Sequence, residues 1–209
     1  GSEMCIRDRD KINNQNKIHL PLLFCEKLKT NFLRTNKQYF LFAGVMTDYR
    51  ANLLKELSEK IGIGAIRYNI IRIQSDKGFK FKWEEALNFE GDSAPFVMYS
   101  HARAASILKK IKRKNDEETI PKELHLSELK LIRTLMKFPS IVTEATERMK
   151  PHKIPYYLQT LSSNFNKFYR DCPVVETEYE WFRKELVIST KKVLFEGLEI
   201  LGIEAPETM

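Results

Sequence analysis

Two side chains suited to contacting nucleic-acid bases stand close together near the middle of the chain. Tyr99 and Arg103 lie four residues apart in the stretch APFVMYSHARAASILKK, so on a helix both point the same way. A phenol ring stacks on unpaired bases, and a planar guanidinium donates hydrogen bonds to base edges. The alternative is structural, with Tyr99 in the core and Arg103 donating to a surface ion pair.

A second pair of this kind lies in the stretch NFNKFYRDCP. Asn166 and Tyr169 are three residues apart and present the same choice between base contact and ordinary packing. Their neighbours Phe165 and Phe168 are expected in the core.

A run of basic residues, KKIKRK, closes the stretch that contains Tyr99 and Arg103. Charges of this kind hold a protein on a phosphate backbone without reading its sequence. Their alternative role is a solvated helix end that complements the helix dipole. The candidate phosphate-contacting residues are Lys109, Lys110, Lys112, Arg113 and Lys114.

The sequence offers little for catalysis. It contains no GxxxxGKS, GxGxxG, GxSxG or HExxH motif. The four histidines are scattered and the three cysteines form no CxxC pair, so no metal site is expected. Cys172, directly before Pro173, is expected to pack at a helix end and not to act as a nucleophile.

Composition indicates a soluble, folded protein with an anionic partner. The 209 residues are 43% hydrophobic and 30% charged, which is typical of a globular chain. The net charge of +7 favours a polyanion such as nucleic acid, although it also fits ordinary solubility charge. Without an apolar run of membrane-spanning length or a signal peptide, a cytoplasmic location is expected and no membrane partner.

The first half of the chain predicts mixed elements. Residues 1–44 read as a leader of low order, partly tag or foreign sequence, with a helix over residues 22–33. Thr47 is the expected N-cap of a helix that Gly62 and Gly64 end. RYNIIRIQ and FKFKW then flank the turn SDKG, which predicts either a pair of strands or an extended excursion between helices.

The second half predicts helices throughout. Asp92 or Ser93 caps a helix that runs to Lys114, and Ser127 caps the next. A strongly amphipathic helix carries apolar residues from Ile154 to Tyr169, and a capping box at Thr177–Glu180 opens the last. The expected fold is mainly α: a short α/β connecting segment over residues 45–87, then a helical bundle over 88–209.

Four stretches of the chain have a characteristic order. They are NFEGDSAPFVMYSHARAASILKK, MKFPSIV, PHKIPYYLQTLSSNFNKFYRDCPVV and the terminal KKVLFEGLEILGIEAPETM. Together they resemble the C-terminal region of arginyl-tRNA synthetases, the arginine tRNA ligases. Residues 62–87 are similar to the segment that joins the family's catalytic domain to its helical anticodon-binding domain.

The resemblance implies an all-helical domain that binds the anticodon stem and loop of arginine tRNA. It implies that the full enzyme attaches arginine to this tRNA using ATP with magnesium, while no cofactor is expected for this chain alone. The motifs YSHAR and NFNKFY and the chain end carry the implied anticodon contacts: Tyr99, His101, Arg103, Asn166, Tyr169 and Met209.

The chain also departs from the family pattern. The HIGH-like and KMSKS-like motifs of the catalytic domain do not occur in residues 1–59, so we expect the chain alone to bind and not to aminoacylate, with a separate catalytic domain as a further partner. Thr208 stands where the family's ending APERM has arginine. One alternative is a free-standing helical interaction or scaffold module that has lost tRNA specificity. The other is RNA binding through charge alone.

Overall fold

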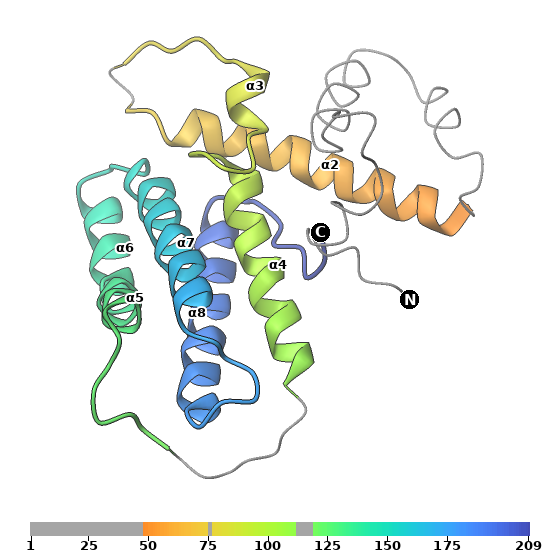
Figure 1. The fold of residues 1–209 in the computed structure, drawn as a ribbon. Coiled ribbons are helices and arrows are strands. Elements are labelled where there is room, and N and C mark those ends of the chain that lie inside the picture. Colours follow the sequence, from red (N-terminus) through yellow and green to blue (C-terminus); the bar gives the residue numbers. More distant parts are fainter. Residues whose placement is uncertain (1–47, 75–76, 112–118) are drawn as a thin grey trace. The chain divides into compact units, whose positions relative to one another are not determined.

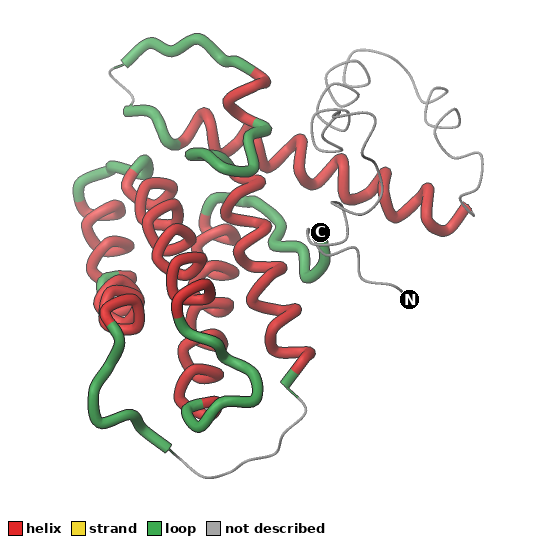
Figure 2. The backbone as a smooth tube through the Cα atoms, viewed as in Figure 1, coloured by secondary structure: helices red, strands yellow, loops and turns green. Residues whose placement is uncertain are grey.

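Helices account for all regular structure in the part of the chain that the structure describes. The computed structural model describes residues 48–74, 77–111 and 119–209, and side chains from Lys55 onward. These residues contain no strand, and the mainly α fold is confirmed (Figure 2). The helices are α2 (Asp48–Ile71), α3 (Trp83–Ala86), α4 (Ala94–Lys110), α5 (Leu126–Met136), α6 (Phe138–Glu147), α7 (Lys153–Asp171) and α8 (Glu180–Ile200).

The core lies where α4, α7 and α8 pack against one another, while α5 and α6 cover α7 (Figure 1). Apolar residues at three- and four-residue spacing on α7 face inward, and Leu158, Leu161, Phe165 and Phe168 are fully buried. Gly197 of α8 lets α7 approach closely, because a Cβ at this position would lie 2.4 Å from Leu158 Cδ2. The predicted amphipathic helix is therefore the central packing element of the bundle.

The prediction that α2 ends at its glycines is wrong. Gly62 and Gly64 do not end it, and RYNII belongs to its last turns instead of a strand. The helix buries Ile61, Ala65 and Tyr68, a spacing that suits a helix face. Gly64 lies at a close approach, since a Cβ there would be 3.0 Å from Ile203 Cγ2 and 3.4 Å from Met98 Sδ.

Helix α4 begins as predicted and ends earlier than predicted. Ser93 is its N-cap and accepts a hydrogen bond from the backbone nitrogen of Phe96, with Pro95 in the first turn. The helix ends at Lys110, and its C-cap Ile111 is extended. Asp92, the other predicted cap, instead forms an ion pair with Arg72 of the α2 end at 2.9 Å.

Two predicted caps are wrong. His125, not Ser127, caps α5, in a reciprocal capping box with Glu128. Helix α8 begins at Glu180, and the Glu180 carboxylate accepts from the backbone nitrogen of Glu176 at 2.6 Å in place of the predicted box. Glu128 of the first box also pairs with Arg183 of α8 at 2.8 Å, a contact between helices that local spacing does not show. The predicted helix over residues 22–33 and the Thr47 cap lie outside the described residues, and the three-part domain division stays a prediction.

Candidate nucleic-acid interface

The structure brings four of the predicted site residues together across α4 and α7. Arg103 Nη1 donates to Asn166 Oδ1 at 2.6 Å, and Nη2 donates to the hydroxyl oxygen of Tyr99 at 3.0 Å. The Arg103 guanidinium carbon lies 4.6 Å from the Tyr99 ring centroid and 5.9 Å from that of Tyr169. Tyr169 is 40% exposed, so the cluster reaches the surface. We call these four residues the α4–α7 face.

The charge of Arg103 is not cancelled by a carboxylate within the described part of the chain. Its two hydrogen-bond partners are a phenol and an amide, both neutral. An arginine held by neutral groups keeps its positive charge and part of its donor capacity for another molecule. The predicted alternative, an Arg103 that serves a surface ion pair, does not fit this arrangement.

Ser100 supports the cluster, and sequence reasoning missed it. This fully buried residue accepts from Asn166 Nδ2 at 3.2 Å and donates to the carbonyl oxygen of Phe96 at 3.0 Å. A serine within an apolar stripe of a helix is the signal that would have found it, because a buried hydroxyl needs a partner.

His101 is not part of the α4–α7 face, contrary to the grouping of Tyr99, His101 and Arg103 in one motif. Residues two apart on a helix point to nearly opposite sides. The His101 side chain is 1% exposed, and its Nδ1 lies 2.9 Å from the carbonyl oxygen of Pro206 in the C-terminal tail, residues 202–209. His101 therefore contacts the tail, not the surface that carries Arg103.

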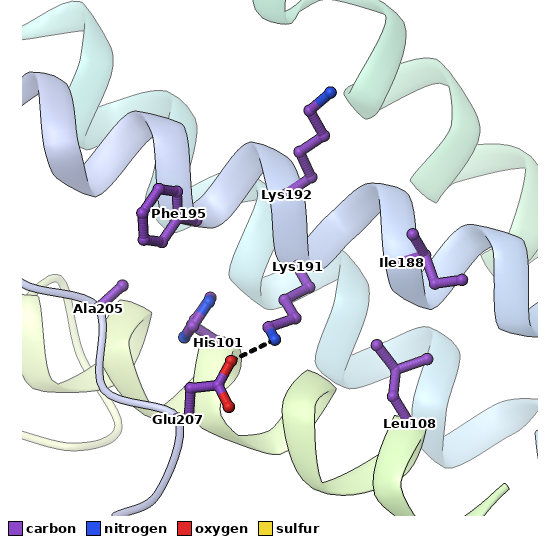
Figure 3. A pocket seen from close by; sticks show the side chains of 8 residues that line it. All are labelled: His101, Leu108, Ile188, Lys191, Lys192, Phe195, Ala205 and Glu207. Carbon is purple, nitrogen blue, oxygen red and sulfur yellow. Dashed lines mark hydrogen bonds and ion pairs between the residues drawn. The ribbon is translucent and has the colours of Figure 1, made fainter.

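A cavity of about 450 Å³ lies beside His101, between α4, α8 and the tail. Figure 3 shows the His101 ring between Phe195 of α8 and Glu207 of the tail. Glu207 pairs with Lys191 at 2.5 Å, which attaches the tail to α8. Burial lowers the pKa of His101, and the positive charge of Lys191 adds to this effect, while the Pro206 carbonyl opposes it.

The remaining predicted contacts are spread over two sides of α4. Lys110 follows Arg103 by seven residues and so shares its side of the helix, whereas Lys109 lies 3.9 Å from Glu207 of the tail. Met209 ends that tail and is partly exposed. Lys112, Arg113 and Lys114 lie outside the described residues.

The described residues lack a metal-binding cluster, an activated thiol and a membrane-spanning helix. Among the described residues, no group of three or more His, Cys, Asp or Glu side chains is placed to hold a metal ion. Cys172 is buried, and burial raises the pKa of its thiol, as in a packing residue. No described helix combines the length and the apolar character needed to cross a membrane.

Comparison with known proteins identifies the bundle. Residues 97–209 match the family model of the DALR anticodon binding domain. The chain belongs to this family. The match begins in the first turns of α4 and includes every residue of the α4–α7 face, so the cluster lies inside the DALR domain.

Curated proteins that match the chain include arginine tRNA ligases. The chain is 45% identical over 165 residues to that of Thermococcus kodakarensis, covering 74% of this chain and 26% of the relative. It is 43% identical over 161 residues to that of Methanocaldococcus jannaschii, covering 74% and 28%. The chain thus spans about a quarter of the length of these relatives.

Solved structures agree with the sequence matches. The arginyl-tRNA synthetase of Thermus thermophilus superposes with a TM-score of 0.70 at 30% identity, covering 90% of this chain and 31% of that one. That of Plasmodium falciparum gives a TM-score of 0.69 at 26% identity, covering 94% and 34%. The chain matches the C-terminal, anticodon-binding part of these enzymes, as the sequence motifs predicted. A free-standing interaction module is not favoured.

Proposed function

We propose that this DALR domain binds the anticodon stem and loop of an arginine-accepting tRNA, with its α4–α7 face against the unpaired bases. The observation that carries the proposal is the placement of Arg103, which is stacked on Tyr99 and held by Asn166 without a carboxylate partner in the described residues. Unpaired bases are recognised by stacking on aromatic or guanidinium planes and by hydrogen bonds to their edges.

The rest of the interface follows from position and charge. Lys110, on the side of Arg103, attracts the phosphate backbone, and Lys109, Lys112, Arg113 and Lys114 extend this attraction. His101 is too buried to touch a base, so its part is to hold the tail through Pro206. Met209, at the end of that tail, contacts the loop from the tail side.

The relatives suggest the larger role. We assign the chain to recognition within an arginine tRNA ligase, where ATP and magnesium serve the attachment of arginine to the tRNA. The sequence carries no nucleotide-binding motif that would hold ATP, so residues outside this stretch would supply that chemistry. Taken alone, the chain binds and does not aminoacylate.

Binding of labelled tRNA, followed by fluorescence anisotropy at two salt concentrations, tests the proposal. One ligand is arginine tRNA and the other is the same tRNA with its central anticodon base replaced. We expect at least about tenfold tighter binding of the unchanged tRNA, which corresponds to about 1.4 kcal/mol. Equal affinities that fall together with salt would overturn base recognition and leave binding through charge alone.

A further inference from the structure

The orientation of the Asn166 amide follows from the groups on either side of it. Ser100 has one hydroxyl proton, and it donates that proton to the Phe96 carbonyl at 3.0 Å. Toward Asn166 the hydroxyl can therefore only accept, so the Nδ2 side of the amide faces Ser100 at 3.2 Å. The carbonyl side then faces Arg103, whose guanidinium can only donate and lies 2.6 Å away.

We infer that Ser100 is a positioning residue for base selection: it fixes the Asn166 amide and thereby aims the Arg103 guanidinium at the bound base. The inference rests on the proposed function. If the amide turned over, its NH₂ group would face the guanidinium, donor against donor, and Arg103 would lose this partner. A buried hydroxyl that never touches RNA would thus decide which base fits.

The consequence for recognition is geometric. Tyr99 and Asn166 take two of the five N–H donors of Arg103, so the guanidinium plane is held while other donors remain available. A fixed fork of donors suits a base edge with two adjacent acceptors, as unpaired cytosine, the central anticodon base for every arginine codon, offers at O2 and N3. It suits uracil less, because N3 of uracil carries a proton and is a donor. A guanidinium free to rotate loses this discrimination because it can adapt to either edge.

The chain provides a matched control for testing Ser100. Ser162 of α7 is equally buried, at 0% exposure like Ser100, but its hydroxyl has no hydrogen-bond partner in the described structure. Ser100→Ala and Ser162→Ala therefore remove the same group from two buried helix positions, and only the first orients Asn166. Differences between the two variants report on orientation and not on burial.

The experiment measures the ratio of affinities for arginine tRNA and for tRNAs carrying each of the other bases at the central anticodon position. We expect a wild-type ratio of at least about tenfold to fall below about threefold in Ser100→Ala, and to stay unchanged in Ser162→Ala. Thermal unfolding confirms that both variants fold. In the Asn166→Ala background, which leaves no amide to orient, Ser100→Ala should cause no further loss.

The outcomes separate this inference from the proposed function. If Arg103→Ala abolishes the preference while Ser100→Ala keeps it, the inference is overturned and the proposed function stands. An equal loss of preference in both serine variants also overturns it, since the effect would then come from packing. A wild-type chain with no preference overturns both. If Ser100→Ala does not fold, a preference retained by Asn166→Ala, which removes the oriented amide itself, is the overturning result, and its loss supports the inference.

Discussion

Arg103 and Arg183 each connect two helices of the same bundle, but their partners differ. Arg183 of α8 donates through Nε to Glu128 of α5 at 2.8 Å and through Nη1 to the Pro173 carbonyl at 2.7 Å. Its side chain is 14% exposed and that of Glu128 is 1% exposed. Arg103 is held by neutral groups instead. An arginine paired with a buried carboxylate therefore serves stability, whereas an arginine held by neutral partners keeps its charge for a ligand.

Removing the structural arginine gives the largest expected effect. Arg183→Met leaves Glu128 charged, buried and without its cationic partner, so we expect a loss of about 3–5 kcal/mol in the free energy of unfolding. Urea unfolding of the variant and the wild type measures this. A loss below about 1 kcal/mol would be that of an ordinary surface ion pair and would contradict a structural role for Arg183.

The same substitution at Arg103 should affect tRNA binding more than stability. Arg103→Met strands no buried charge, so its unfolding free energy should change by no more than about 1 kcal/mol. Its affinity for arginine tRNA should fall by about 1–3 kcal/mol, more than for a tRNA with a replaced anticodon base. Anisotropy titrations with both tRNAs measure the difference. Equal losses for both would show that Arg103 contributes charge alone.

His101, on the opposite side of α4 from Arg103, should make the stability of the fold depend on pH. Burial holds the pKa of His101 below its ordinary value of 6.5, so in acid the unfolded chain takes up a proton that the folded chain resists. The contribution is complete above pH 6.5 and is lost as the pH falls through the folded-state pKa. His101→Asn, which keeps an amide donor for Pro206, should unfold with a flatter dependence on pH below 6.5 than the wild type. Identical slopes in urea titrations would contradict this.

The smallest expected effect separates the two described lysines at the end of α4. Lys110→Ala should weaken every RNA alike and reduce the slope of log affinity against log salt by about 0.7. Lys109→Ala should change the slope less, because Lys109 lies away from the Arg103 side of α4, on the side that faces Glu207 of the tail. Affinities at several salt concentrations test the order. A larger slope change for Lys109→Ala would indicate that the RNA phosphates contact the side of α4 that faces the tail.

Local patterns in the sequence predicted most of the helical bundle. The spacing of Leu158, Leu161 and Phe165 identified α7, and Ser93 with Pro95 identified the start of α4, because periodicity and capping depend on neighbours within a turn. The pairing of Tyr99 with Arg103 also followed from spacing alone. The contacts of these two with Asn166 and Tyr169 did not, since spacing within a helix says nothing about which other helix it faces.

What the sequence determined by itself is the family, the helical class and the residue types of the α4–α7 face. Tertiary structure decided that α2 runs through Gly64, where the helix packs closely on Ile203 and Met98, two residues distant in the chain. It also turned His101 toward the tail and gave Arg103 neutral partners. These outcomes depend on which groups meet across helices, and the burial of those groups sets their charge and hydrogen bonding.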